Sequence, residues 1–146
     1  MKGNVFLDTN IIVYLFDKTD AAKHASAKRI IRECIKKYTG HISTQVVNEF
    51  VVVVSEKIKN PIPFEEIKKR ITSLSDMLTI SPLAFLTCKK SIDIKQRYGY
   101  SYWDSLIISS ALLNYCSILY TEDMQDGQTI EKTLKIVNPF KVNNSL

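Results

Sequence analysis

The chain has 146 residues, 45% of them hydrophobic, and its 20 Lys and Arg against 15 Asp and Glu give a net charge of +5. This combination fits one globular domain with a hydrophobic core and excludes disordered, collagen-like and linker-like chains. No apolar run approaches the roughly 18 to 20 residues that cross a bilayer, and Asp8 interrupts any signal-peptide core. We therefore expect a cytoplasmic protein without a membrane partner. The positive charge is typical of proteins with an anionic partner, nucleic acid above all.

Cysteine and histidine usage argues against several kinds of site. The chain has an odd number of cysteines and no Cys-x-x-Cys pair; they are Cys34, Cys88 and Cys116. We expect buried free thiols in a reducing compartment rather than a zinc ribbon. His24 and His41 are isolated in the sequence, so it gives little support to a histidine metal site or a Ser-His-Asp triad.

Apolar periodicity and capping residues predict strands that alternate with helices along the whole chain. Five short strands are expected, at residues 5–7, 41–43, 77–80, 117–120 and 135–137. Helices, with their caps, are expected at 11–16, 20–40, 44–60, 64–75, 82–98 and 101–112, and Gly40 and Gly99 are the expected stops of two of them. This order predicts a three-layer α/β/α domain with a central parallel sheet of four to five strands. We expect the domain to span residues 1–141 and residues 142–146 to form a loose tail.

Four acidic residues occupy positions that this topology would bring together. Asp8 directly follows the first strand, Glu49 lies early in the helix after the second, Asp104 begins the helix before the fourth, and Asp123 follows the fourth. Ligands of such sheets bind beyond the carboxyl ends of the strands, near the topological switch point. Converging carboxylates raise one another's pKa, and the hard cations Mg²⁺ and Mn²⁺ are the ions that neutralise them. Asp126 is an alternate fourth acid.

Each of these acids also has an ordinary structural interpretation. Asp8 can cap a helix, Asp104 can serve as a favourable first-turn charge, and Glu49 can lie on a solvated face. Asp123 and Asp126 fit turn chemistry. Only their joint position at one sheet edge favours a site.

Four segments resemble the motifs of PIN-domain ribonucleases, in the same order. They are residues 6–12 (Phe-Leu-Asp-Thr-Asn-Ile-Ile), 47–50 (Val-Asn-Glu-Phe), 102–107 (Tyr-Trp-Asp-Ser-Leu-Ile) and 119–123 (Leu-Tyr-Thr-Glu-Asp). The resemblance extends from residue 4 to about residue 140, and the length is similar to that of the single-domain VapC-type toxins of toxin–antitoxin pairs. It implies an endoribonuclease that uses Mg²⁺ or Mn²⁺, acts as a homodimer and is blocked by a small antitoxin.

Carried over by position, the resemblance also implies roles for individual residues. Asp8 and Asp104 would be the principal metal ligands, and Glu49 and Asp123 would complete the cluster. Supporting hydrogen bonds to carboxylates or phosphate would come from Thr9, Asn10 and Thr121. Because no histidine–lysine pair is evident to drive attack by the 2′-hydroxyl, we expect water to attack in line and leave 5′-phosphate and 3′-hydroxyl ends.

The segment before Asp104 supplies candidate RNA contacts, which are Lys95, Arg97, Tyr98 and Tyr100. Both tyrosines can equally pack against the core, and we expect Trp103 to do so. A non-catalytic RNA-binding protein on the same fold is the alternative function. A phosphatase of the haloacid dehalogenase type is less expected, because Asn10 stands where that family has its second Asp.

Overall fold

The computed structural model describes residues 2–141, so the predicted tail at 142–146 lies outside the described residues. Within them the strands are β1 (Gly3–Leu7), β2 (Tyr38–Ser43), β3 (Thr79–Ser81), β4 (Ile118–Tyr120), β5 (Thr129–Ile130) and β6 (Leu134–Val137). The helices are α1 (Thr9–Phe16), α2 (Ala21–Lys36), α3 (Thr44–Val52), the π-helical turn η1 (Val53–Lys57), α4 (Phe64–Met77), α5 (Phe85–Tyr98) and α6 (Tyr102–Leu113).

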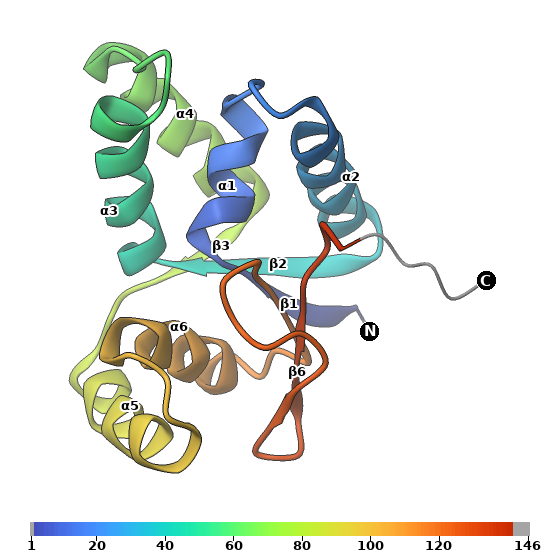
Figure 1. Cartoon of the computed structure of the whole chain (residues 1–146), viewed down its shortest axis with the longest axis vertical. Coiled ribbons are helices and arrows are strands. Elements are labelled where there is room, and N and C mark those ends of the chain that lie inside the picture. The colour runs from blue at the N-terminus through green and yellow to red at the C-terminus, as the bar shows by residue number, and fades with distance from the viewer. Residues whose placement is uncertain (1, 142–146) are drawn as a thin grey trace.

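The strands form one sheet in the order β3-β2-β1-β4-β6-β5, parallel everywhere except between β5 and β6. Helices α1 to α4 cover one face of the sheet, and α5 and α6 cover the other (Figure 1). The predicted α/β/α class is therefore confirmed. The sequence patterns did not predict β5, which is a two-residue antiparallel edge strand.

The central strand β1 forms the core of the sheet. Val5, Phe6 and Leu7 are completely buried, because β1 lies between β2 and β4 with helices on both faces. A strand buried on both faces has a continuous apolar sequence rather than an alternating one. The chain leaves β1 toward β2 on one side and returns as β4 on the other, so the topological switch point lies between β1 and β4.

Local signals in the sequence set several helix boundaries. Asp8 and Asp20 cap α1 and α2 by accepting backbone N–H groups, and Ser101 caps α6 in the same way. Gly99 ends α5 with a φ of 79°, a left-handed conformation that favours glycine. These four residues act as the sequence predicted.

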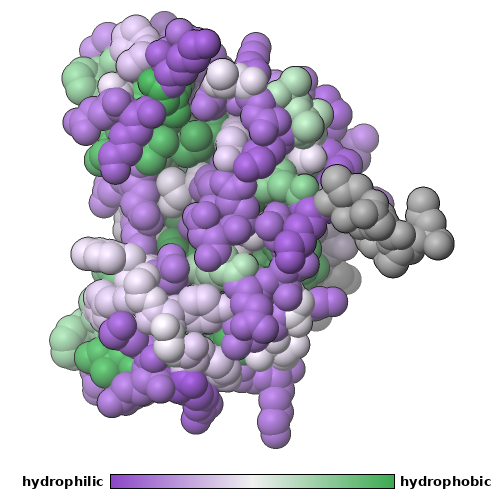
Figure 2. Space-filling view, in the orientation of Figure 1, coloured by the Kyte–Doolittle hydropathy of each residue, from purple (hydrophilic) through white to green (hydrophobic). Residues whose placement is uncertain are grey.

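Apolar and polar surfaces are unevenly distributed on the molecule. Figure 2 shows apolar surface over α5 at the lower left and over α3 and α4 at the upper left, whereas the right of this face is mostly hydrophilic. Phe85 and Leu86 at the start of α5 are 79% and 60% exposed. Among residues 2–141 we find no helix with the length and apolar character that crossing a bilayer requires.

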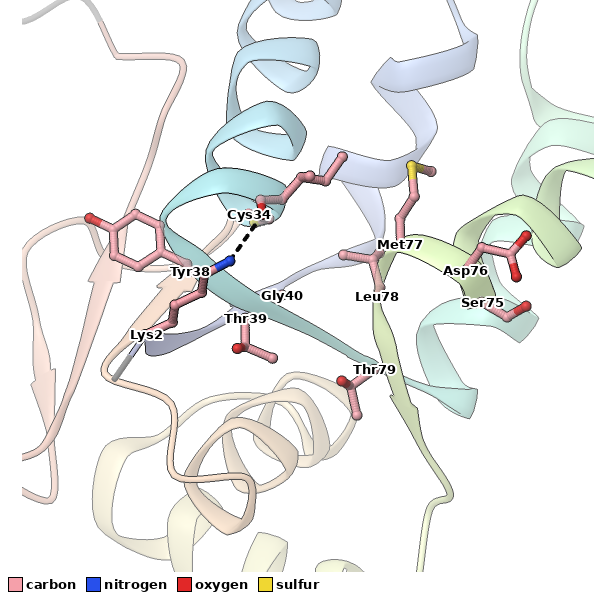
Figure 3. A pocket seen from close by; sticks show the side chains of 11 residues that line it. Lys2, Cys34, Tyr38, Thr39, Gly40, Ser75, Asp76, Met77, Leu78 and Thr79 are labelled. Carbon is pink, nitrogen blue, oxygen red and sulfur yellow. Dashed lines mark hydrogen bonds between the residues drawn. The ribbon is translucent and has the colours of Figure 1, made fainter.

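Gly40 does not end a helix as predicted; it lies inside β2, and α2 ends earlier, at Lys36. Pairing with β1 extends β2 back to Tyr38, which is opposite Gly3. A Cβ atom at Gly40 would lie 2.6 Å from Leu78 Cδ2 and 3.1 Å from Cys34 Cβ (Figure 3). The close packing of β2 against these side chains therefore favours glycine at this position.

We expect Gly40→Ala to lower the free energy of unfolding by about 1–3 kcal/mol, because the added methyl group overpacks the core. Urea unfolding followed by circular dichroism measures this change. Gly3→Ala is the matched control, since a Cβ there meets only Tyr38 Cδ1, at 3.7 Å. Equal midpoints for the two variants would show that Leu78 and Cys34 move aside without cost.

Candidate active site

Asp8 lies at the switch point, immediately after β1. Its backbone N–H donates to the Tyr120 carbonyl (3.0 Å), which continues the pairing of β1 with β4. Its carboxylate accepts from Thr9 N (2.7 Å) and from Thr121 Oγ1 (2.8 Å). Asp8 is only 6% exposed, so the folded chain holds this carboxyl group rigidly in a largely dry place.

The surroundings of Asp8 oppose its ionisation. Burial, with smaller contributions from the negative charges of Glu49 and Asp104, raises its pKa to about 7. The two hydrogen bonds from Thr121 and Thr9 lower the pKa and offset only part of this effect. A buried carboxylate of this kind needs a positive charge beside it to remain ionised.

The other three predicted acids come from three separate elements, and two of them, Glu49 and Asp104, lie near enough to Asp8 to raise its pKa. Glu49 lies on α3, Asp104 in the first turn of α6, and Asp123 in the loop after β4. Burial raises the pKa of both Glu49 and Asp104. The charge of Asp123 raises both pKa values as well, and that of Asp104 also raises the pKa of Glu49. The structure thus brings the four carboxylates into one electrostatically coupled cluster, which we call the acidic cluster.

The three predicted supporting residues each hydrogen-bond to a different acid of this cluster. Thr121 Oγ1 donates to Asp8, and Thr9 Oγ1 donates to Glu49 Oε1 (3.4 Å). Asn10 Nδ2 donates to Asp123 Oδ2 (2.8 Å). Three of the four acids are therefore each oriented by a neighbour within the chain.

The segment after β4 contains three acids, and the structure separates their roles. Glu122 is held away from the cluster by the hydroxyl of Tyr14 (2.7 Å) and by Lys23 Nζ (2.8 Å). Asp126 accepts from the backbone N–H of Asn138 (2.7 Å) and pairs with Lys141. Asp123 alone of the three is coupled to Glu49 and Asp104, so this geometry favours it over Asp126 as the fourth acid.

The predicted RNA contacts before Asp104 have partners inside the chain instead. Tyr98 and Tyr100 accept from the backbone N–H groups of Glu131 and Gln125 (2.9 and 3.1 Å), so their hydroxyls anchor the two loops on either side of β5. Lys95 Nζ donates to the Tyr100 carbonyl, and Arg97 lies 4.0 Å from Glu131. Of the two interpretations open for the tyrosines, packing is the one that this arrangement supports.

Trp103 contradicts its prediction: it is 66% exposed rather than packed in the core. The physical reason is its place in the first turn of α6, ahead of the buried stretch that begins at Ser105. Sequence reasoning also missed Gln45, which is 7% exposed and donates from Nε2 to the Trp103 carbonyl (3.1 Å). Nothing local in the sequence signals this contact, because 58 residues separate its two partners.

Two cavities differ in their relation to the acidic cluster. One of about 380 Å³ lies at the cluster and is lined by Asn10, Glu49 and Asp123 among others. Another, of about 510 Å³, lies where β2 and β3 begin, beside Lys2 and Gly40, and contains none of the predicted acids (Figure 3). Of these two cavities, only the first is lined by residues that the sequence predicts for the site.

The donor set of the acidic cluster fits a hard divalent cation. Its ligating atoms are carboxylate oxygens, which suit Mg²⁺ and Mn²⁺. No three acidic, histidine or cysteine side chains of residues 2–141 are grouped closely enough to hold an ion by themselves. Mg²⁺ does not need such a cage, because it commonly binds to one or two carboxylates and keeps water and substrate phosphate as its other ligands. The unneutralised charge around buried Asp8 is the observation that favours this fit.

Comparison with known proteins assigns this chain to a family. The family model of the PIN domain matches residues 5–125, which include all four acids of the cluster. The chain belongs to the PIN domain family. The resemblance inferred from its four motifs is thereby confirmed.

Solved structures share the fold of this PIN domain. VapC20 of Mycobacterium tuberculosis, a sarcin–ricin loop cleaving toxin, is 17% identical with a TM-score of 0.65, over 82% of this chain and 89% of that one. A toxin–antitoxin complex from Klebsiella pneumoniae contains a chain that is 20% identical with a TM-score of 0.69, over 94% and 99%. A chain of VapBC2 from Rickettsia felis, a complex bound to a fragment of its promoter DNA, is 20% identical with a TM-score of 0.62. The match covers 92% of this chain and 99% of that one. At such identities the likeness concerns the fold, and no curated protein matches the sequence.

Proposed function

We propose that this PIN domain is an endoribonuclease that uses Mg²⁺ or Mn²⁺ to hydrolyse RNA phosphodiester bonds. The observation that carries this proposal is the acidic cluster, where Asp8 is buried at the switch point and coupled to two further carboxylates. A fold shared with a toxin that cleaves the sarcin–ricin loop supports the same activity. Outside the cluster the chain has 20 Lys and Arg and 11 acids, which gives a net charge of +9. This positive charge favours binding of the RNA backbone.

In this proposal Asp8 and Asp104 hold the cation, with Glu49 and Asp123 beside them. When bound, a divalent cation neutralises charge on the phosphodiester and lowers the pKa of water. The chain's own contribution is orientation: Thr121 and Thr9 N–H fix Asp8, and further side chains fix the flanking acids. Burial of Asp8 keeps bulk water from this carboxylate, which strengthens its charge interactions, whereas Glu49 and Asp104 are half-buried and Asp123 is exposed.

The hydrogen bonds of the flanking acids suggest how the cluster stays open to substrate. Thr9 bonds one oxygen of Glu49, and Asn10 bonds one oxygen of Asp123, whose second oxygen is left for a bound ion or its water. Both acids also line the cavity of about 380 Å³. A phosphate group that enters this cavity faces these two carboxylates, so its approach would depend on the neutralising cation.

We also propose that the enzyme is a homodimeric toxin that a small antitoxin inhibits, and that it acts in the cytoplasm. The fold that it shares with subunits of toxin–antitoxin complexes supports the pairing. Its three free cysteines, of which Cys34 and Cys116 are buried and Cys88 is half-buried, support a reducing compartment. Co-purification with the product of an adjacent short reading frame tests the pairing, and light scattering tests the dimer.

The activity test is cleavage of end-labelled single-stranded RNA by the purified protein. We expect cleavage in Mn²⁺ or Mg²⁺, its loss in excess EDTA, and products with 5′-phosphate and 3′-hydroxyl ends. These ends are expected because the cluster contains carboxylates rather than a histidine–lysine pair that activates a 2′-hydroxyl. A 2′,3′-cyclic phosphate, or undiminished cleavage in EDTA, would overturn the mechanism. RNA binding without any cleavage in Mn²⁺ would instead indicate a non-catalytic RNA-binding protein.

A further inference from the structure

A third cavity, of about 670 Å³, lies beside the acidic cluster between α3 and the start of α6. We call it the indole pocket, because Trp103 forms part of its wall. Val52 of α3 and Leu83 add apolar surface, while Asn48 and Lys57 add an amide and a cation. Glu49 lines both this pocket and the cavity of the cluster, so an occupant of one lies next to an occupant of the other.

Trp103 is exposed, and contacts to its backbone and to its ring link it to Gln45 and Tyr102. Its carbonyl accepts from the buried amide of Gln45, and its ring meets Tyr102 edge-on with centroids 6.0 Å apart. Trp103 as a residue is 66% exposed, which leaves much apolar surface in water, and exposed apolar patches commonly mark binding sites. An aromatic face beside the acidic cluster suits a flat apolar ligand.

We propose that the indole pocket binds an unpaired nucleobase of the RNA, stacked on Trp103, from the nucleotide next to the scissile phosphate. The proposal rests on the proposed nuclease function. Unpaired bases stack on aromatic side chains whatever their sequence, and amide groups such as that of Asn48 hydrogen-bond to base edges. The volume lies within the usual range for small-ligand sites, and Lys57 can pair with a neighbouring phosphate.

The polar groups of the pocket favour RNA over a protein partner. The centres of protein interfaces are depleted of charged residues, whereas this pocket contains both Glu49 and Lys57. Phe85 and Leu86, which are also exposed, do not line the pocket. They offer a comparison, because a protein partner that covers the apolar surface of α5 would depend on them.

The test uses Trp103 as its own probe, because it is the only tryptophan of the chain. The full-length protein is titrated with a short single-stranded RNA in Ca²⁺, with gels to check that the RNA stays uncut. We expect saturable quenching of tryptophan emission, and none with an abasic oligonucleotide of the same length. Trp103→Ala should weaken RNA binding about tenfold or more by anisotropy, and Trp103→Phe should weaken it less. Phe85→Ala is the matched control and should bind RNA normally.

The opposing outcomes are distinct from failure of the nuclease proposal. Absence of quenching, or unchanged RNA affinity of Trp103→Ala, overturns the indole pocket even if the protein cuts RNA. A change of molecular mass in solution for both Trp103→Ala and Phe85→Ala, with RNA affinity unchanged, also overturns it and identifies a self-association face. If quenching and the affinity loss occur but Mn²⁺ supports no cleavage, the base site stands and the nuclease proposal fails.

Discussion

Asp8→Asn should lower the rate of metal-dependent RNA cleavage by about 10³-fold, because it removes a carboxylate charge from the most buried position of the acidic cluster. The change keeps the size of the side chain and the acceptor for Thr9 N–H, so the loss reports charge rather than shape. Single-turnover rates in Mn²⁺ with a labelled RNA measure the effect. A rate within about tenfold of the unchanged protein would exclude Asp8 as a principal ligand.

The segment after β4 supplies a matched pair of variants for the same assay. Asp123→Asn should also slow cleavage strongly, since Asp123 is coupled to Glu49 and Asp104. Asp126→Asn removes an identical charge only three residues away, but this carboxylate faces Asn138 and Lys141, so the rate should stay near that of the unchanged protein. The opposite ranking would move the fourth acid to Asp126.

The second large effect concerns stability, pH and metal. Asp8 has an ordinary pKa of 3.8 in the unfolded chain, and burial raises it to about 7 in the folded protein. Between these two values the folded state binds more protons than the unfolded state. The free energy of unfolding therefore falls as the pH rises through this interval, and the loss is complete above about pH 7. A shift of this size corresponds to roughly 4 kcal/mol.

We expect this fall to appear in metal-free protein and to be much smaller in Asp8→Asn, whose amide does not titrate. Urea unfolding at pH 4, 6 and 8 in EDTA compares the two proteins. At pH 8, Mn²⁺ should raise the melting temperature of the unchanged protein and have little effect on Asp8→Asn, since a bound ion stabilises only the state that holds it. Parallel pH profiles for the two proteins would contradict the raised pKa, and equal metal responses would contradict binding at Asp8.

The raised pKa values also connect function with the fold. Glu49 and Asp104 shift in the same direction as Asp8, so metal-free protein carries a repulsion that grows with pH. Active sites commonly contain such groups, whose pKa values burial and like charges raise together. A rise in melting temperature on adding the cation would therefore report metal binding at the site. This measurement does not require the RNA substrate to be known.

The sequence alone determined the family, the α/β/α class and the positions of the acids, because these depend on local signals. Caps such as Asp8 and Ser101, and the continuous apolar run of β1, act over a few residues and are visible in the chain. Only the tertiary structure decided which acid after β4 faces the cluster, why Gly40 is a glycine, and that Trp103 lies at the surface. Each of these depends on partners far away in the chain, such as Lys23 for Glu122, Leu78 for Gly40 and Gln45 for Trp103. Residues that look alike in the local sequence, such as the three acids after β4, are distinguished only by the distant segments that pack against them.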